Sequence, residues 1–405
     1  MMNTRNIIAF FSFFLIGNLY LDLTLYDIES FPLVIFLLFL LNYSKVKLIQ
    51  SITILVVIYI LSSFFSGEIG VMESSFTSFI QLLTAIIVFI SLFSYLEYVN
   101  KDDFNHIVFI VFCIVSFISI IQYLNIDSNF IEVIRKSIHP NIYDINDELI
   151  RDENITISGK ARPVGMAKEP SYLSIFVVFC GYCILSLGKK YQKVIFLILF
   201  SFYFYSNTSP ILALFFLIYG LHFYLKINGV NKKIIASLLL LLVFFVCFYI
   251  LKLRFETAIN RDLDWDFLYT SFQQGLITTE SSLGIRLFNP FITMFNILLD
   301  NPLFGSGFSN LSYIQEHSNV LHFRPKNVLS NIIASGFIYI GIVGMILLSF
   351  SIKPHVKNVN LTTFVLFYLI LSFTGGGFVT IRFWSILFLF LSVYILSNRP
   401  NHEEY

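Results

Sequence analysis

The chain has 405 residues, of which 57% are hydrophobic and 13% are charged, and its formal net charge is +1. This composition excludes an ordinary water-soluble domain of the same length. The small net charge, without a basic stripe interleaved with aromatic residues, also sets aside a nucleic-acid partner. The sequence therefore predicts an all-α polytopic integral membrane protein, with residues 1–405 in a single membrane domain.

Apolar segments long enough to cross a bilayer recur along the chain. A spanning helix needs about 20 mostly apolar residues, because its backbone polar groups find no partners in lipid. We predict about twelve transmembrane helices on this criterion. In chain order they are Ile7–Leu23, Phe31–Tyr43, Leu48–Phe65, Phe76–Leu96, His106–Leu124, Pro170–Leu187, Val194–Tyr205, Pro210–Leu225, Ile234–Leu251, Val328–Phe350, Leu361–Phe373 and Phe378–Leu396.

Lysines in the short connections predict the orientation, since basic residues close to membrane segments stay cytoplasmic. With a cytoplasmic amino terminus, these lysines all fall on the cytoplasmic side, and Arg399 places the carboxyl terminus there too. Residues 125–169 and 252–327 then form two long extracytoplasmic loops. The lysines are Lys45, Lys47, Lys189, Lys190, Lys193, Lys226, Lys232, Lys233, Lys353 and Lys357.

The first long loop ends in a polar stretch that leads directly into a membrane segment. Pro170 suits the first turn of a helix, so Glu169 falls at the cap position. Arg162 and Lys168 precede it, and a guanidinium there is suited to a diphosphate. Glu169 is a catalytic candidate as well, and helix capping by Glu169 and simple solvation of the loop remain the alternatives.

The second long loop carries Arg286 ahead of an apolar pattern at helical spacing. The pattern is too short to span, and we expect an interfacial helix near residues 290–299. Arg286 at its start can clamp a diphosphate in two parallel hydrogen bonds. The alternative is that Arg286 only contacts lipid head groups.

Two imidazoles gather at the end of this loop, in His317 and His322, together with Arg324, Lys326 and Asn327. Histidine titrates near neutral pH and is the usual general acid or base, so we expect one of the two to transfer a proton. Their spacing is not the helical i, i+4 relation of many metal ligands, and we predict no metal. A merely solvated loop is the alternative.

Arg382 lies inside the last predicted membrane segment. A charge at such a position is costly and usually faces a cavity or a partner, so we include Arg382 among the substrate-binding candidates. Arg382 can instead extend outward to the membrane edge.

These groups, in this order, resemble the O-antigen and capsular polysaccharide polymerases, a family related to the O-antigen ligases. The resemblance covers most of the chain from the fifth predicted helix onward. Its pieces are Arg162-Pro-Val-Gly165, Glu169-Pro170-Ser171, Ser206-Asn-Thr-Ser209, Arg286 ahead of Asn301-Pro-Leu-Phe-Gly305-Ser-Gly307, and Asn327 ahead of Ile332 to Gly344.

The resemblance implies a glycosyltransferase of the bacterial plasma (inner) membrane, with a fold similar to the multi-helix membrane glycosyltransferases and no cofactor. It would transfer a growing glycan from undecaprenyl diphosphate to the next undecaprenyl diphosphate-linked repeat unit on the extracytoplasmic face. Arg162 and Arg286 would stabilise the leaving diphosphate, and an outer-loop histidine would act on the acceptor hydroxyl. Expected partners are the lipid-linked oligosaccharide, membrane lipid, and a chain-length regulator and a flippase of the same pathway.

The chain departs from the family pattern in one place, where Lys326-Asn327 replaces the His-Asn pair of many relatives. This leaves the proton acceptor open, with His317 ranked ahead of His322. Two other functions stay open as well. One is an O-antigen ligase that uses a lipid A core as acceptor, and the other is a lipid-linked oligosaccharide flippase or transporter. A transporter is disfavoured because it would keep its charges within the helical bundle.

Overall fold

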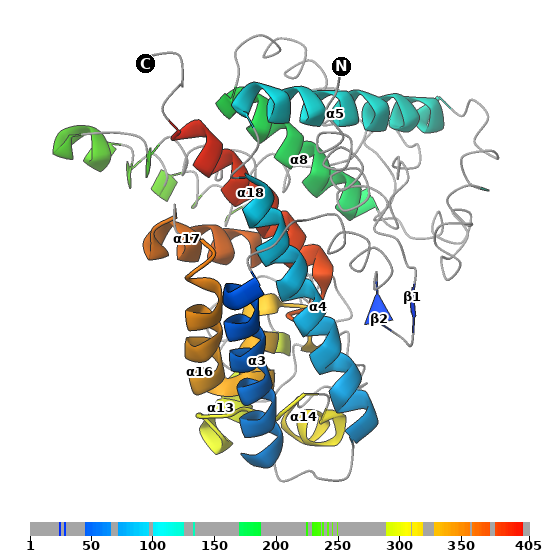
Figure 1. The fold of residues 1–405 in the computed structure, drawn as a ribbon, viewed down its shortest axis with the longest axis vertical. Helices are drawn as coiled ribbons and strands as arrows, with labels where there is room; N and C mark the ends of the chain where they lie inside the picture. The colour runs from blue at the N-terminus through cyan, green and yellow to red at the C-terminus, as the bar shows by residue number, and fades with distance from the viewer. Residues whose placement is uncertain are drawn as a thin grey trace. The chain divides into compact units, whose positions relative to one another are not determined.

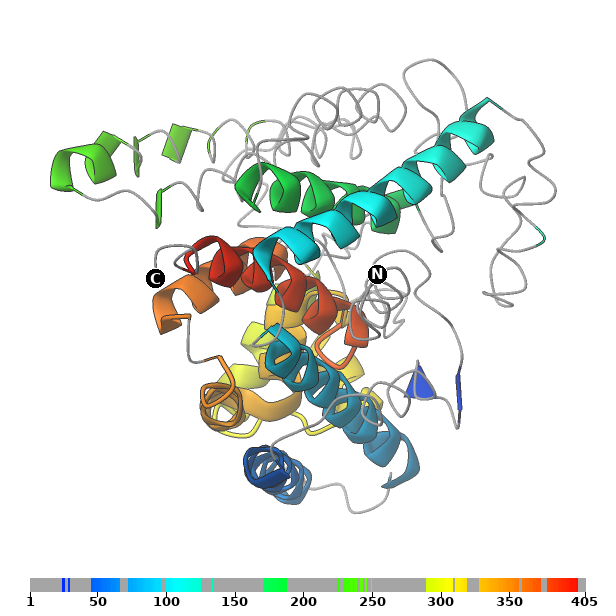
Figure 2. The ribbon, with the colours of Figure 1, turned by 45° about the horizontal axis from the view of Figure 1, so that its top comes forward.

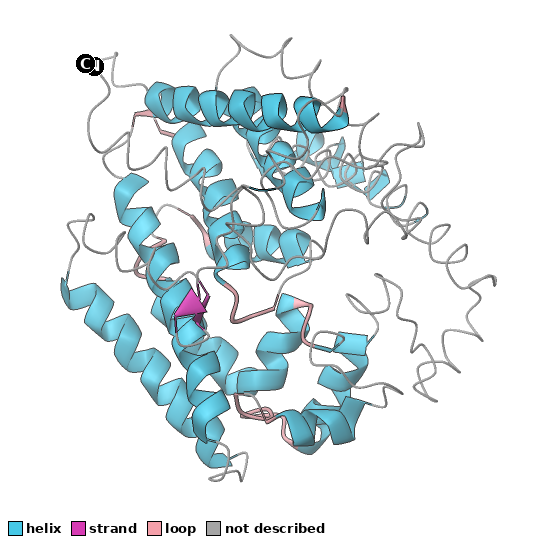
Figure 3. Ribbon diagram, turned by 90° about the vertical axis from the view of Figure 1, so that its right-hand side faces the viewer, coloured by secondary structure: helices cyan, strands magenta, loops and turns pink. Residues whose placement is uncertain are grey.

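The computed structural model describes residues 24–25, 28–29, 45–65, 72–96, 100–124, 133, 170–187, 224–225, 229–235, 237–238, 241–242, 245, 249, 289–308, 310–318, 328–356, 359–372 and 377–399. Nearly all regular structure in these residues is α-helix (Figure 3), as the sequence predicts. The exception is a pair of two-residue strands, β1 (Thr24–Leu25) and β2 (Ile28–Glu29).

Predicted apolar segments coincide with helices wherever the structure describes them. These helices are α3 (Lys45–Phe65), α4 (Met72–Leu96), α5 (Lys101–Tyr123), α8 (Pro170–Leu187), α16 (Ile332–Ile352), α17 (Leu361–Ser372) and α18 (Ile381–Ser397). The second long loop contributes two more, α13 (Asn289–Asp300) and α14 (Leu311–Ser318). The predicted segments Ile7–Leu23, Phe31–Tyr43 and Val194–Tyr205 lie outside the described residues, as does almost all of Pro210–Leu225.

Two helical stretches, Lys101–Gln122 and Ile332–Ile352, are long and apolar enough to cross a membrane, judged by length and composition. Buried helices of water-soluble proteins pass the same test, so the two stretches alone give weak support for a membrane location. Shorter apolar helices accompany them in α3, α4, α17 and α18. The set of about twelve spans stays a prediction.

The chain divides into two compact units. The first comprises residues 1–24, 95–250 and 388–405, and in it α5 packs against α8 (Figure 2). The second comprises residues 25–94 and 251–387, and it holds α3, α13, α14, α16 and α17. The prediction of a single membrane domain is not decided by this division.

Helices α3 and α16 lie side by side in the second unit (Figure 1). At one end, the Ser51 hydroxyl donates to the Ser351 carbonyl at 2.9 Å and lies 2.8 Å from His355 Nε2. At the other end, the Phe65 ring stacks on Phe304, with centroids 4.2 Å apart. The amino-terminal end of α3 therefore meets the carboxyl-terminal end of α16.

The polarity of α3 is inverted relative to a helix on the surface of a water-soluble protein. Its inner face buries Ser51 and Ser62, at 2% and 1% exposure, together with Leu55 and Ile58 that lie between them. Its outer face is apolar, with Phe64 exposed by 72%. Small polar residues inside and large apolar residues outside are typical of helices that pack in lipid. The outer faces of α16 and α17 follow the same rule, with exposed Ile342, Ile346, Phe350, Leu361, Val365 and Leu369.

Helix α16 is broken at Gly341, whose φ is 60° and ψ is −167°. The break frees backbone groups, and the loop between α13 and α14 satisfies them. The amides of Ile342 and Val343 donate to the carbonyls of Pro302 and Leu303, at 3.1 and 3.0 Å. The Ser306 amide donates to the Ile338 carbonyl at 2.7 Å. Residues 302–306 thus complete the hydrogen bonding on both sides of the gap.

Two glycines make this docking possible, because the backbone of residues 302–306 lies directly against the backbone of α16. A Cβ at Gly341 would lie 2.5 Å from the Leu303 carbonyl oxygen, and one at Gly305 would lie 2.4 Å from the Ile338 oxygen. Both glycines also have positive φ, which side chains disfavour. Phe308 fixes the far end of the loop through ring contacts with Tyr59, Phe79 and Tyr339.

Candidate functional site

The structure describes two of the predicted site residues, His317 and Arg382. His317 lies on α14, and Arg382 falls in the first turn of α18, where only its backbone is described. The other predicted site residues lie outside the described residues: Arg162, Lys168, Glu169, Arg286, His322, Arg324, Lys326 and Asn327. The site is therefore built around His317.

Helix α13 begins just after Arg286, at the segment where the sequence predicts an interfacial helix. Its apolar residues recur at helical spacing, and one face buries Ile292 and Ile297 where α13 packs on α16. The helix ends at Asp300, and Pro302, two residues later, prevents its continuation. The Asn301 side chain then donates to the Gly305 carbonyl at 2.9 Å and closes the turn. The placement of α13 in a membrane interface stays a prediction.

Helix α14 is short and amphipathic, and a buried asparagine starts it. Asn310 is at the N-cap, and its side-chain oxygen accepts from the Tyr313 amide at 3.0 Å. Ile314 is fully buried on the inner face. Tyr313 and His317 are four residues apart, so their side chains lie on the same face of the helix.

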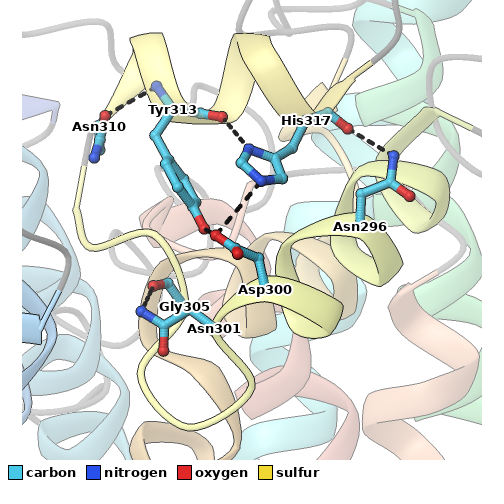
Figure 4. Close-up of polar contacts among 7 residues, drawn as sticks. All are labelled: Asn296, Asp300, Asn301, Gly305, Asn310, Tyr313 and His317. Carbon is cyan, nitrogen blue, oxygen red and sulfur yellow. Dashed lines mark hydrogen bonds and ion pairs between the residues drawn. The ribbon is translucent and has the colours of Figure 1, made fainter.

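Asp300, Tyr313 and His317 form one polar group, here called the Asp300 cluster (Figure 4). The Tyr313 hydroxyl donates to Asp300 Oδ2, and His317 Nε2 lies 3.7 Å from the same oxygen. The other ring nitrogen, His317 Nδ1, is 2.8 Å from the Tyr313 carbonyl oxygen. The two rings also face each other, with centroids 4.2 Å apart. The cluster thus joins the end of α13 to α14.

A second contact fixes the spacing of the two helices. The Asn296 side-chain amide on α13 donates to the His317 carbonyl on α14 at 2.8 Å (Figure 4). That carbonyl lies in the last turn of α14, where no helical donor is left for it. Hydrogen bonds of Asn301 and Asn310 also hold the turn after α13 and the start of α14. The orientation of the three side chains is therefore set before any ligand arrives.

The cluster is open to solvent on the carboxylate side. The Asp300 side chain is 61% exposed and the His317 side chain 23%. Burial, and then the hydrogen bond to Asp300, raise the pKa of the Tyr313 phenol, so that it remains a hydrogen-bond donor at neutral pH. An exposed carboxylate beside an imidazole and a phenol can bind hydroxyl groups and can transfer protons.

The donor set does not suit a structural metal. Among the described residues no group of three or more His, Cys, Asp or Glu side chains converges. The cluster itself offers one carboxylate and one imidazole, and Tyr313 already occupies one carboxylate oxygen.

Sequence reasoning identifies His317 but misses Asp300 and Tyr313. Asp300 reads as the end of a helix, because Asn301-Pro302 follows it. The spacing of Tyr313 and His317 is the available signal, since two polar aromatic residues at i, i+4 share one helix face. Their contact with Asp300 depends on the turn between α13 and α14, whose path is fixed by tertiary contacts with α16.

No family model, no curated protein and no solved structure matches the chain. A function is therefore inferred from the sequence patterns and from the geometry of the Asp300 cluster. Both point to the segment that runs from Arg286 to α16.

Proposed function

We propose that this chain is a multi-pass glycosyltransferase of the bacterial plasma (inner) membrane, with both termini in the cytoplasm. It polymerises lipid-linked oligosaccharide repeat units on the extracytoplasmic face. The growing glycan passes from undecaprenyl diphosphate to a hydroxyl at the non-reducing end of the next undecaprenyl diphosphate-linked repeat unit. Arg162 and Arg286 bind the diphosphate, and the Asp300 cluster acts on the acceptor.

One observation carries the proposal, namely that the Asp300 cluster and the lysine-rich connections are found at opposite ends of the α3–α16 pair. Ser51 and Ser351 mark one end, beside Lys45 and Lys47 in the first turn of α3 and Lys353 at the end of α16. Phe65 and Phe304 mark the other, where the loop that follows Asp300 is docked. The basic residues predict that the first end is cytoplasmic. The cluster then belongs to the face on which lipid-linked repeat units are polymerised.

The chemistry of the cluster supports a transfer to a hydroxyl group. Arg286 comes shortly before α13, and α13 ends at Asp300, so the diphosphate-binding candidate and the proton-transfer candidate belong to one continuous segment of the chain. A glycosyl transfer from a diphosphate needs these two functions, stabilisation of the leaving group and removal of the acceptor proton. The inverted polarity of α3, α16 and α17 supports their placement in lipid.

Cysteine labelling tests the orientation. Ser312 and Lys353 are both exposed, the first on α14 and the second at the end of α16. We expect a membrane-impermeant maleimide to label Ser312→Cys in intact spheroplasts, and to label Lys353→Cys only after permeabilisation. The unsubstituted chain, with its four cysteines, provides the background. Labelling of Lys353→Cys in intact spheroplasts would contradict the orientation.

A reconstituted assay tests the reaction. The purified chain receives the host's undecaprenyl diphosphate-linked repeat unit, with no nucleotide sugar, and the products are separated on a gel. We expect a ladder of longer lipid-linked glycans from the wild type. Arg286→Ala should lower the rate about 100-fold or more, because it removes charge stabilisation of the departing diphosphate. Arg286→Lys is the matched variant, since it keeps the charge and loses the bidentate geometry.

The same assay separates the alternatives. A ligase would give no ladder until a lipid A core acceptor is added, and would then yield a single transfer product. A flippase would give neither product, but would move the lipid-linked unit across a proteoliposome membrane. A folded wild-type protein that binds the substrate and forms no ladder would overturn the polymerase proposal.

A further inference from the structure

The two oxygens of the Asp300 carboxylate are in different situations. Oδ2 accepts the Tyr313 hydroxyl and faces His317 Nε2. Oδ1 accepts no hydrogen bond from the part of the chain that the structure describes. Because the side chain is 61% exposed, Oδ1 is open to a ligand. A carboxylate held through one oxygen and open at the other is fixed in direction while keeping a free acceptor.

The ring nitrogens of His317 face two different acceptors. Nδ1 lies 2.8 Å from the Tyr313 carbonyl oxygen, which can only accept, so Nδ1 carries a hydrogen. Nε2 faces Oδ2 of the Asp300 carboxylate at 3.7 Å. Tyr313 and His317 therefore both face Oδ2, and Oδ1 is the acceptor that the cluster leaves open.

We propose that Asp300, through Oδ1, accepts the proton of the acceptor sugar hydroxyl, and that Tyr313 and His317 are positioning residues that hold its carboxylate. This inference rests on the proposed function and names the base of that reaction. The acceptor oxygen forms a bond to the anomeric carbon of the donor glycan. The bond from that carbon to the diphosphate oxygen breaks, its electron pair leaves with undecaprenyl diphosphate, and the hydroxyl proton moves to Asp300.

The surroundings of Asp300 suit this role. Tyr313 stays a neutral donor, because burial and the contact with Asp300 raise its pKa. The contacts of Asn296 and Asn310 hold α13 and α14 together, so the three side chains need little reorganisation. The role departs from the sequence-based ranking of His317 as proton acceptor, and gives His317 the task of orienting the carboxylate.

The test uses the full chain in lipid nanodiscs, with the lipid-linked repeat unit and initial rates of glycosidic bond formation. We expect Asp300→Asn to lower kcat about 100-fold or more, because the amide cannot accept the proton. KM should stay near the wild-type value, since substrate binding is retained. Tyr313→Phe and His317→Gln should each lower kcat about 10-fold, the loss expected when one contact that orients the carboxylate is removed. Glu316→Gln removes a neighbouring exposed carboxylate of α14 and should leave kcat unchanged.

Chemical rescue separates proton transfer from structural support. Formate, a free carboxylate, should restore part of kcat to Asp300→Ala and none to Arg286→Ala. Size-exclusion chromatography and thermal unfolding verify that the Asp300 variants are folded. If Asp300→Asn does not fold, Tyr313→Phe decides the question, and an unchanged kcat in that variant overturns the proposal.

The failures of the two proposals are distinguishable. A wild-type ladder together with wild-type kcat in Asp300→Asn overturns the role of Asp300 and leaves the polymerase standing. An equal loss in Glu316→Gln overturns it too, because the effect would then be one of general charge. An inactive wild type overturns the polymerase proposal, and the role of Asp300 with it.

Discussion

Gly341→Ala is expected to lower the free energy of unfolding by roughly 2–6 kcal/mol, from backbone strain and overpacking together. An alanine forced into the φ and ψ of Gly341, a region that almost only glycine adopts, costs about 1–3 kcal/mol. The new methyl group would also lie 2.5 Å from the Leu303 carbonyl oxygen, and overpacking of this kind costs about 1–3 kcal/mol. Backbone cannot move aside as a flexible side chain can. The loop would leave the gap, and Ile342 and Val343 would lose their acceptors.

Gly229→Ala is the matched control. Gly229 also has a positive φ, of 109°, but a Cβ there meets nothing within 4 Å. Gly229→Ala should cost only the backbone strain of a side chain at positive φ, roughly 1–3 kcal/mol. Unfolding of both variants in mixed micelles, titrated with SDS, measures the two free energies. Equal losses would mean that the close approach of residues 302–306 to α16 contributes nothing, and that φ alone explains the effect.

Trp384→Ala is expected to lower the free energy of unfolding by about 3–5 kcal/mol, the usual cost of removing a buried aromatic side chain. Trp384 is 1% exposed and makes edge contacts with Phe89 and Phe378, at centroid distances of 5.5 and 6.2 Å. Its indole Nε1 donates to the Phe378 carbonyl at 2.9 Å. The Phe378 amide in turn donates to Ser335 Oγ at 2.9 Å. The substitution therefore opens a cavity and also frees the turn that joins α18 to α16.

Two variants divide this loss into its parts. Trp384→Phe keeps most of the volume and loses the indole N–H, so it should cost about 1–2 kcal/mol. Phe350→Ala removes a side chain of similar size from the outer face of α16, where Phe350 is 57% exposed. Its effect should stay within about 0.5 kcal/mol, as for other surface changes. Equal effects of Trp384→Ala and Phe350→Ala in the same SDS titration would refute the packing argument.

Helix positions could be predicted where apolar length and local signals agree. Helix α8 runs from Pro170 to Leu187, as predicted, because proline favours the first turn and the apolar run is uninterrupted. Helix α3 starts three residues before the predicted Leu48, at Lys45, since lysine is a good helix former although it is not apolar. The break at Gly341 could not be predicted. The sequence is apolar on both sides of Gly341, so hydropathy shows no break there. The backbone groups freed at the break bond to residues 302–306, which are distant in the sequence.

Of the three residues of the Asp300 cluster, only His317 could be predicted from the sequence. His317 is visible in the sequence as an imidazole in a polar loop. Its partners are not, because the path of the chain between Asp300 and Tyr313 depends on Gly305, on Phe308 and on the gap in α16. A periodicity argument also misses α14, which has few apolar residues and spans only two turns.

If α16 crosses the membrane, as we propose, the gap in this helix imposes an order of assembly on the chain. Residues 302–306 leave the ribosome before Gly341, so the groups that fill the gap already exist when the gap is made. Without residues 302–306, the second half of α16 would enter the bilayer with unpaired backbone amides. Each unpaired amide would cost roughly several kcal/mol. The loop and the helix should therefore be inserted together, as one unit. A chain truncated after α14 would retain the loop but lack the helix that it completes.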